Sequence, residues 1–557
     1  MSIGLSIKVV GTVVELFLPF ILTHILDNVI VTADVGRVVF FGAIMILCAA
    51  VAAFCNVTAN RMAAKVSSDI SNNIRQDLFD RILYLSAKDT DRYTIPSLES
   101  RITTDTYNVH HFISMMQRMG IRAPIMLVGG IIITMIMDST LSLVMLAMIP
   151  VIFIFVYFMS KKGIPLYARV QKSVDGMVRV VREDVQGMRV IKALSKGEYE
   201  NQRYDKVNAK LSYDERKAGM VMGMVNPFMT LLMNLGITAV VAISASLISN
   251  GRSTAATVIA FMQYFTYISM ALMAISRIFT GFTKSAASAD RIDEVIQTPE
   301  HFFVKESQKR DTDAYISFKN VSFSYFGRQD DLKDISFSLK KGQKLGIIGA
   351  TGSGKSTLIK LLMRFYEAGS GEIEVDGKNI TSYSREELSR FFGAALQNDF
   401  LYADTISENI KLGRDLSDED VVRASKTAQA DEFISMLKDG YSHTLSQKGT
   451  NLSGGQRQRI LIARAVAAHP PILILDDSSS ALDYKTDASL RKAISQDLTA
   501  STVITVAQRV SSVMSSDLIL VLDEGKIIGK GTHEELLNSC PEYKEISDSQ
   551  MGGAFVE

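Results

Sequence analysis

The chain has 557 residues, a formal net charge of +1 and a hydrophobic fraction of 47%. This length predicts more than one domain, and the balanced charge excludes an electrostatic case for a nucleic-acid partner. Long apolar stretches fill the first half, whereas charge is spread evenly through the second half. The cysteines, Cys48, Cys55 and Cys540, predict no disulfide framework and no metal site; the first two are expected to fill apolar space and Cys540 to be a surface thiol.

Six stretches of the first half are long and apolar enough to cross a membrane as helices, each near the ~20 residues that the hydrocarbon core requires. The expected spans are residues 4–26, 37–56, 121–137, 140–160, 219–248 and 254–279. No small-residue cleavage pattern follows the first stretch, so a span is expected there and not a signal peptide. We therefore assign residues 1–295 to a membrane domain, 296–312 to a linker and 313–557 to a second domain.

Basic residues gather in two long connections, one between the second and third spans and one between the fourth and fifth. They include Arg61, Lys65, Arg75, Arg81, Lys88, Arg92, Arg101, Lys161, Lys162, Arg169, Lys172, Arg179, Arg182 and Arg189. The positive-inside bias places both connections in the cytosol. Apolar residues recur at three- and four-residue steps through 66–85 and 170–194, so the spans are expected to continue there as helices. The alternative is a pair of solvated charged linkers.

Two ionisable residues fall within or at the start of expected spans: Glu15 in the first and Arg122 in the third. Charge at membrane depth is a functional hypothesis by default, and the alternative is a position near the cytosolic headgroups. The spans are also rich in methionine, which suits a surface that accepts varied apolar ligands. Ordinary membrane packing explains most of these methionines equally well.

The second half contains a glycine-rich loop that fits the phosphate-loop pattern G-x-x-x-x-G-K-[ST] without a mismatch. An apolar run at 344–348 predicts a strand before the loop, and helical spacing at 358–363 predicts a helix after it. Glycines in this context let backbone N–H groups turn toward phosphate oxygens. Lys355 is expected to neutralise the β- and γ-phosphates of ATP, and Ser356 to bind Mg²⁺. The loop residues assigned to ATP are Gly349, Thr351, Gly352, Ser353, Gly354, Lys355, Ser356 and Thr357.

Three further features accompany the loop. Tyr325, some two dozen residues earlier, has a ring that could stack on adenine or pack in a hairpin core. The run Leu452–Gln456 opens a predicted helix and forms a second candidate anion-binding helix N-terminus. An apolar run from Pro471 ends in Asp476 and Asp477, which is typical of a buried parallel strand that presents carboxylates at its end. Asp476 is expected to hold Mg²⁺.

These motifs, in this order and spacing, resemble the nucleotide-binding domain of an ATP-binding cassette (ABC) protein. With six spans ahead of the cassette, the chain resembles over essentially its full length a half-transporter of the type IV, exporter class. The resemblance implies an α-helical six-span transmembrane domain fused to an α/β P-loop ABC ATPase domain, in a plasma (inner) membrane with the nucleotide-binding domain in the cytoplasm. It also implies a dimer in which each ATP lies between one chain's phosphate loop and the other chain's Leu452–Gln456 run.

The resemblance assigns further roles by position. Tyr325 corresponds to the adenine-stacking aromatic, and Gln397 to the glutamine that senses both Mg²⁺ and the attacking water. The residues implied to face the partner's ATP are Leu452, Ser453, Gly454, Gly455, Gln456 and Asp483. Coupling helices are implied in the cytosolic connections, near Ala87–Tyr93 and Glu198–Tyr204.

The chain departs from the family pattern at two catalytic positions. Asp477 stands where a catalytic Glu is usual, and Gln508 stands where a switch His is usual. Other departures are Gln447-Lys448-Gly449 ahead of the Leu452–Gln456 run, a short or absent N-terminal elbow helix, and no preceding peptidase domain. The last of these argues against a bacteriocin-maturing exporter.

The leading interpretation is a subunit of a heterodimeric multidrug-type exporter. Its partners would be a second half-transporter with the usual Glu and His, membrane lipid, and an amphipathic drug, lipid or apolar peptide as substrate. ATP and Mg²⁺ are the implied cofactors, and this chain's own site, built on Asp477, Gln508 and Gln397, is expected to hydrolyse ATP weakly. The alternatives are a homodimeric exporter and a non-pumping ATP-gated channel or regulator.

Overall fold

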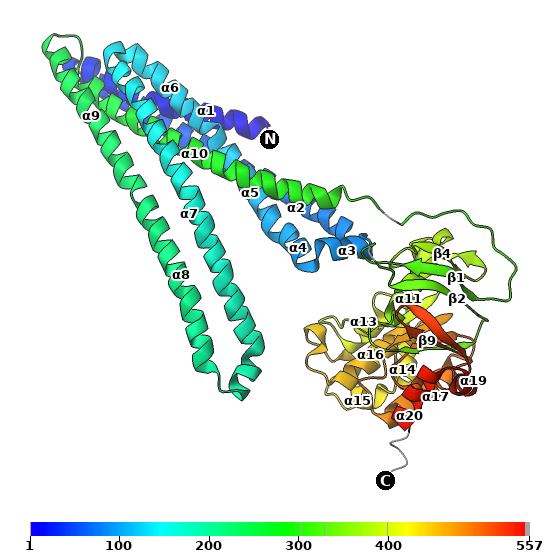
Figure 1. Cartoon of the computed structure of the whole chain (residues 1–557). Coiled ribbons are helices and arrows are strands. Elements are labelled where there is room, and N and C mark those ends of the chain that lie inside the picture. The colour runs from blue at the N-terminus through cyan, green and yellow to red at the C-terminus, as the bar shows by residue number, and fades with distance from the viewer. Residues whose placement is uncertain (1, 301, 328, 398, 552–557) are drawn as a thin grey trace. The chain divides into compact units, whose positions relative to one another are not determined.

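The computed structural model describes residues 2–300, 302–327, 329–397 and 399–551 (Figure 1). The chain divides into two compact units: unit 1 is Met1–Leu83 with Pro96–Thr298, and unit 2 is Tyr84–Ile95 with Pro299–Glu557. A short segment from within the first half, Tyr84–Ile95, thus groups with unit 2. The domain boundaries expected near residues 295 and 313 stay a prediction.

Unit 1 is built from helices. They are α1 Ser2–His24, α2 Val35–Leu83, α4 Ile95–Ser100, α5 Thr106–Met115, α6 Arg122–Met137, α7 Ser139–Ala193, α8 Gly197–Gly223, α9 Val225–Ser249 and α10 Ala255–Ile296, with π-helical turns η1 Ile25–Val29, η3 Arg101–Asp105 and η4 Met116–Gly120 and a 3₁₀ turn η2 Ile30–Thr32. Within the described residues, six helical stretches are long and apolar enough to cross a membrane, as expected from the sequence. The expected helical continuations are confirmed, because α2 runs to Leu83 and α7 to Ala193.

Helices α1, α2, α5, α6, α7 and α9 of unit 1 pack against α10, which supplies the largest buried aromatic side chains of the unit. Phe261 and Tyr264 are fully buried in a cluster that includes Leu16 of α1 and Leu141 of α7. The Tyr264 hydroxyl donates a hydrogen bond to the Leu16 carbonyl at 2.7 Å. A buried Tyr hydroxyl needs such a partner, and this hydrogen bond ties α10 to α1.

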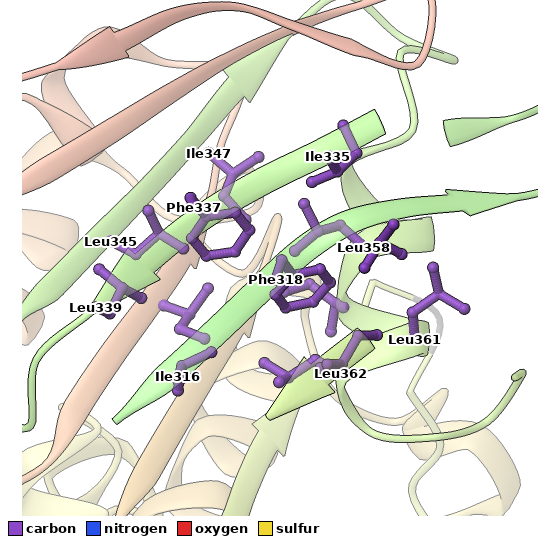
Figure 2. Packing of buried hydrophobic residues seen from close by; sticks show 14 of the residues in the cluster. Ile316, Phe318, Ile335, Phe337, Leu339, Leu345, Ile347, Leu358, Leu361 and Leu362 are labelled. Atoms are coloured by element: carbon purple, nitrogen blue, oxygen red, sulfur yellow. The ribbon is translucent and has the colours of Figure 1, made fainter. Parts of the chain in front are cut away.

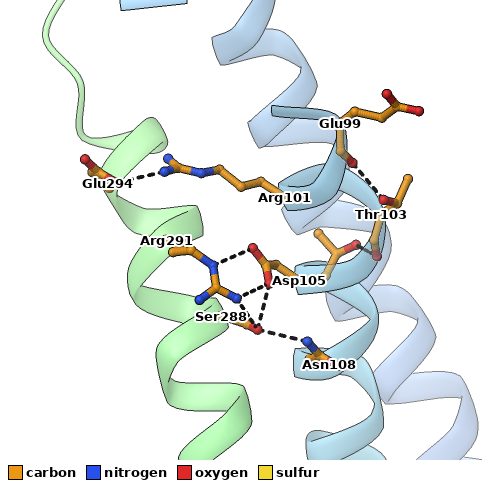
Figure 3. Close-up of polar contacts among 9 residues, drawn as sticks. Glu99, Arg101, Thr103, Asp105, Asn108, Ser288, Arg291 and Glu294 are labelled. Carbon is orange, nitrogen blue, oxygen red and sulfur yellow. Dashed lines mark hydrogen bonds and ion pairs between the residues drawn. The ribbon is translucent and has the colours of Figure 1, made fainter. Parts of the chain in front are cut away.

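A polar network joins η3 and α5 to α10 (Figure 3). The Asp105 carboxylate, 2% exposed, accepts hydrogen bonds from Arg291 Nε at 2.9 Å and from the Ser288 hydroxyl at 2.8 Å. Asn108 donates to the same Ser288 hydroxyl at 3.0 Å, and Arg101 pairs with Glu294 at 3.0 Å. Because a buried carboxylate is costly unless it is paired and hydrogen-bonded, this network fixes η3 against α10.

Unit 2 contains one short helix from the first half, α3 Ala87–Tyr93, and an α/β fold from the second half. Its strands are β1 Ile316–Phe323, β2 Leu332–Leu339, β3 Lys344–Gly349, β4 Ser370–Val375, β5 Lys378–Asn379, β6 Phe392–Ala395, β7 Ile472–Asp476, β8 Thr502–Val506, β9 Leu518–Asp523 and β10 Lys526–Gly531. Its other helices are α11 Lys355–Leu362, α12 Arg385–Ser389, α13 Ile406–Lys411, α14 Asp418–Thr427, α15 Asp431–Ser435, α16 Gly454–Val466, α17 Tyr484–Asp497, α18 Val510–Val513, α19 His533–Ser539 and α20 Pro541–Met551.

Two sheets organise unit 2. One is antiparallel, in the order β2-β1-β4-β5; the other has the order β10-β9-β3-β8-β7-β6, in which β9, β3, β8, β7 and β6 are parallel. The apolar run predicted before the phosphate loop is β3, and the run that ends in Asp476 is β7. Both are buried central strands of the parallel sheet, so their carboxyl ends meet at one edge, where ligands bind in such sheets.

A hydrophobic core lies between the antiparallel sheet, β3 and α11 (Figure 2). Phe318 of β1 and Phe337 of β2 stack with ring centroids 4.7 Å apart. Leu358, Leu361 and Leu362 of α11 are fully buried in the same core. Because α11 and β3 are both anchored there, the loop between them is fixed at both ends.

The prediction for Cys540 is wrong. Its side chain is 2% exposed and packs among Val513, Leu536 and Tyr543. Burial raises the pKa of its thiol. The polar composition of the C-terminal segment suggested a surface position, but α19 and α20 fold back on the parallel sheet and bury one face.

Candidate nucleotide site

The phosphate loop has the backbone that its glycines predict. Gly352 and Gly354 have φ values of +86° and +98°, in the left-handed region that side chains disfavour. A Cβ at Gly354 would lie 2.7 Å from Leu332, so this position also requires glycine for close packing. Lys355 begins α11, and its ammonium group donates to the carbonyls of Gly349 and Ala350 at 2.9 and 2.6 Å. The lysine therefore lies along the loop that it is expected to serve.

The end of β7 meets the start of α11 beside this loop. The Ser356 hydroxyl donates to Asp476 Oδ1 at 3.2 Å, and Asp476 is 4% exposed. Burial raises the pKa of the Asp476 carboxyl, and the Ser356 hydrogen bond partly offsets this effect. A hydroxyl and a carboxylate oxygen side by side are ligands that Mg²⁺ prefers.

The two residues that depart from the family pattern contact each other. Gln508 Nε2 donates to Asp477 Oδ2 at 3.1 Å. Asp477 has φ +49°, in a region where Asp is better tolerated than most residues, and its N–H donates to the Val506 carbonyl at 2.9 Å. Burial raises the pKa of the Asp477 carboxyl, while the charge of Lys355 and the Gln508 hydrogen bond lower it.

Most predicted site residues line one cavity of about 510 Å³. It brings together Thr351, Gly352, Gly354, Lys355, Ser356, Thr357, Gln397, Asp476, Asp477 and Gln508. Gly349 and Ser353 belong to the loop but do not line the cavity; the Ser353 side chain is 3% exposed.

The charge of this cavity suits a magnesium-bound phosphate better than a bare one. Its lining includes two lysines, Lys333 and Lys355, and five carboxylates, Asp330, Asp331, Asp476, Asp477 and Glu524. Burial lowers the pKa of Lys355, and the charges of Asp477 and Asp476 oppose that shift. An excess of carboxylates repels a phosphate chain unless a divalent cation accompanies it, so the residues fit Mg²⁺ together with a nucleotide.

The run Leu452–Gln456 lies outside this cavity, and its role toward a partner's nucleotide stays a prediction. Ser453 is the N-cap of α16: its hydroxyl accepts from Gln456 N at 3.2 Å, and the Gln456 side chain accepts from Ser453 N at 3.0 Å. The hydroxyl proton stays available to donate. A Cβ at Gly454 would meet no heavy atom within 4 Å, so that surface is open.

Asp483 is the N-cap of α17 and accepts from Thr486 N at 2.9 Å and from the Thr486 hydroxyl at 2.8 Å. These hydrogen bonds lower the pKa of the Asp483 carboxyl. Its structural task is therefore to begin the helix that follows the β7 strand, and it too lies outside the cavity.

Tyr325 does not line the phosphate cavity but touches its edge. Its hydroxyl donates to the Thr357 hydroxyl at 3.2 Å, and its ring meets that of Tyr366 edge-on at 5.0 Å. Tyr366 in turn donates to Asp91 of α3 at 2.5 Å. Sequence reasoning missed Tyr366, which links the aromatic next to the nucleotide loop to the segment Tyr84–Ile95 within unit 2. No motif marks it, because its role depends on where α3 lies.

Gln550 of α20 is a second residue that the sequence did not indicate. Its side chain donates to the Gln508 carbonyl and accepts from Val510 N–H, both at 2.8 Å. The amide thus pairs with the backbone of residues 508–510, called here the switch segment, as a neighbouring strand would. A glutamine in a polar C-terminal helix gives no signal of this in the sequence.

A six-span helical unit joined to an ATPase with this phosphate loop defines a class of protein: a membrane transporter that carries its own ATPase. The comparisons agree. Residues 1–272 match the family described as "ABC transporter transmembrane region", and residues 332–480 match the one described as "ABC transporter". The chain therefore belongs to the ABC transporter family, as a multi-pass membrane protein with an exporter-type transmembrane domain and a cytoplasmic ATPase domain.

Relatives match along nearly the whole chain. "Uncharacterized ABC transporter ATP-binding protein YfiB" of Bacillus subtilis is 36% identical over 553 residues, which cover 99% of this chain and 96% of the relative. "Uncharacterized ABC transporter ATP-binding protein Rv1273c" of Mycobacterium tuberculosis is 32% identical over 560 residues, with the same coverage. The solved structure titled "Structure of a bacterial Atm1-family ABC exporter with ATP bound" has a TM-score of 0.82 at 23% identity and covers 100% of this chain and 98% of that one, which shows the shared fold.

Proposed function

We propose that the chain is one subunit of a heterodimeric, ATP-driven exporter for amphipathic or hydrophobic substrates, and that it contributes the weakly hydrolytic ATP site. Family membership gives ATP hydrolysis coupled to transport and a dimer, either with itself or with another half-transporter. The observation that favours the heterodimer is the contact between Asp477 and Gln508, 3.1 Å apart. Both replacements fall at the hydrolytic end of one site.

The chemistry of this pair supports weak hydrolysis. A carboxylate at position 477 would orient the attacking water, and Asp is one methylene shorter than Glu, so it withdraws by roughly 1 Å, which costs about 10²-fold in rate. Gln508 donates a hydrogen bond but cannot become cationic. That hydrogen bond goes to the Asp477 carboxylate itself.

Binding of the nucleotide is proposed to be intact at the same site. Lys355 would neutralise the β- and γ-phosphates, and the Tyr325 ring would stack on adenine. Ser356, Asp476 and Gln397 would hold Mg²⁺, which when bound supplies charge neutralisation of the phosphates. ATP would therefore remain at this site for long periods.

The remaining residues are proposed to serve the other site of the dimer. Leu452, Ser453, Gly454, Gly455 and Gln456, with Asp483, would face the ATP held by the partner's phosphate loop. The Ser453 hydroxyl keeps its proton for the γ-phosphate while its oxygen caps α16. One chain would thus contribute weakly hydrolytic residues to one ATP site and an intact Leu452–Gln456 run to the other.

The test compares the ATPase activity of four preparations: this chain alone, this chain with a half-transporter that has Glu and His at the two positions, the Asp477→Glu/Gln508→His variant alone, and the Asp477→Glu variant alone. We expect little activity in the first and marked activity in the second. Activity in the third shows that the fold supports hydrolysis once both groups are restored, whereas Asp477→Glu by itself should restore little. Brisk hydrolysis by the unmodified chain alone would contradict the proposal and favour a homodimer.

A further inference from the structure

We propose that unit 1 holds a resident anionic phospholipid in a groove between α1 and α6, with its head group at a cluster of cationic side chains. The groove has a volume of about 470 Å³, and all of its lining residues are apolar; they include Val13 and Phe17 of α1 and Pro124, Val128 and Ile132 of α6. At Gly129 the two helices approach so closely that a Cβ would lie 2.6 Å from Leu16. Glycine at this position therefore forms the floor of the groove.

Charged side chains lie at one end of the groove. Arg122, two residues before Pro124, pairs with Glu15 at 2.7 Å, and Glu15 lies between the lining residues Val13 and Phe17. Arg118 is one helical turn before Arg122, and among the residues that the structure describes it donates only to Ser114, within its own turn. The apolar groove thus ends where the guanidinium groups begin.

A third cation lies behind this end. Lys8 is 3% exposed, and its ammonium group donates to the side-chain oxygens of Asn56 and Asn60 at 2.8 and 3.2 Å. Its charged neighbours are Arg122, Glu15 and Arg118. Even without Lys8, the two guanidinium groups and one carboxylate leave an excess of one positive charge, which needs an anion in a medium of low dielectric.

The length of the groove matches the depth of one membrane leaflet. From Pro124 to Ile133 the α6 helix rises about 14 Å, close to half of the ~30 Å hydrocarbon core. The cationic end is the cytosolic one, because α6 runs from Arg122 to the short extracytosolic connection at Asp138. The cytosolic leaflet is also where anionic lipids create a negative surface potential. An acyl chain would fill the apolar groove, and the phosphate of the same lipid would pair with Arg118 and Arg122 at its cationic end.

The chain contains no tryptophan, which allows a site-specific test. Val128→Trp places a single fluorophore in the groove, since Val128 is 54% exposed there. The full-length variant is reconstituted with brominated phosphatidylglycerol or brominated phosphatidylcholine, whose acyl bromines quench nearby tryptophan. We expect the anionic lipid to quench at about fivefold lower mole fraction, since each nearby cation attracts it.

Matched variants separate the head-group contact from general effects. Arg118→Gln in the Val128→Trp background should abolish the preference without leaving Glu15 unpaired, whereas Lys162→Gln, an exposed lysine of α7, should leave it unchanged. Ile46→Trp, at a position of α2 that is 70% exposed, should show no preference between the lipids.

Three results would overturn the proposal. Equal quenching of the Val128→Trp protein by both lipids would mean an apolar surface without head-group recognition. Absence of quenching by either lipid would mean that a second copy of the chain or another segment covers the groove. A preference that disappears when ATP and Mg²⁺ are added to the assembled transporter would identify the lipid as cargo and not as a resident component. All three readouts are independent of whether this chain's own ATP site hydrolyses.

Discussion

The two ends of the nucleotide cavity in unit 2 are built from the same parallel sheet but differ in their chemistry. At one end, the loop after β3 has glycines with positive φ at Gly352 and Gly354 and a lysine aligned along it, as the family pattern requires. At the other end, after β7 and β8, Asp477 and Gln508 replace the usual Glu and His and contact each other. Under the proposed roles, nucleotide binding and hydrolysis would depend on separate residues, so that binding could persist while hydrolysis weakens.

The largest effect should come from the surface that serves the partner. In the assembled dimer, Ser453→Ala should lower steady-state ATPase and transport by about 10²-fold, because it removes a hydrogen bond made where charge develops. Gly454→Asp should do the same by placing a carboxylate near the partner's phosphates; within this chain a Cβ at Gly454 meets nothing within 4 Å, so the substitution leaves the fold of the chain itself undisturbed.

Asp477→Asn is the counterpart at this chain's own site and should cost much less. Asn tolerates the φ of +49° as Asp does, so the backbone is undisturbed and any loss reports on chemistry. If Asp477→Asn abolishes turnover while Ser453→Ala leaves it intact, the proposed division of roles between the two sites is wrong.

The next largest effect is expected on the affinity for ATP. Lys355→Ala should weaken ATP affinity at this chain's phosphate loop by about tenfold or more, because a charge-assisted contact to phosphate is lost. Lys340→Ala, an exposed lysine with a side chain 69% accessible, is the matched control. Equilibrium binding of a fluorescent ATP analogue measures both, and unchanged affinity in Lys355→Ala would refute the assignment of the loop.

A smaller effect is expected from the C-terminal helix. In the Asp477→Glu/Gln508→His background, Gln550→Ala should lower the regained ATPase activity by about fivefold, since two backbone hydrogen bonds to the switch segment are lost. Gln550→Glu keeps the acceptor for Val510 N–H and should be intermediate. ATP affinity is expected to stay constant in both, and a fall in affinity equal to the fall in rate would mean that Gln550 supports the fold of the site and not the switch segment.

The smallest effect should come from the adenine side. Tyr325→Ala should raise the dissociation constant for ATP by about threefold through loss of a stacking face. Tyr325→Phe keeps the ring and removes only the hydrogen bond to Thr357, so it should bind nearly as the unmodified chain does. Equal losses in the two variants would show that the hydroxyl, and not the ring face, carries the contribution.

Prediction from sequence succeeded where one short pattern dictates local structure. The phosphate loop, β3, β7 and the six spans follow from glycine spacing and apolar run length, and the structure has them all. It failed where the outcome depends on distant packing. Cys540 is buried because α19 folds back on the sheet, Gln550 reaches Gln508 across 42 positions of sequence, and Tyr366 finds Asp91 from 275 positions away. The local sequence around each of these residues gives no hint of such contacts.

The network around Asp105 in unit 1 has a mechanical consequence. The chain passes between the units after Leu83, after Ile95 and after Thr298. The second crossing leads within a few residues into η3, and the third leaves from the end of α10, the two elements that Asp105, Ser288 and Arg291 tie together. Separating them would leave a carboxylate that is 2% exposed without its partners, at a cost of several kcal/mol. The connections after Ile95 and after Thr298 therefore enter unit 1 at two elements that are bonded to each other. A force on either connection would act on both η3 and α10.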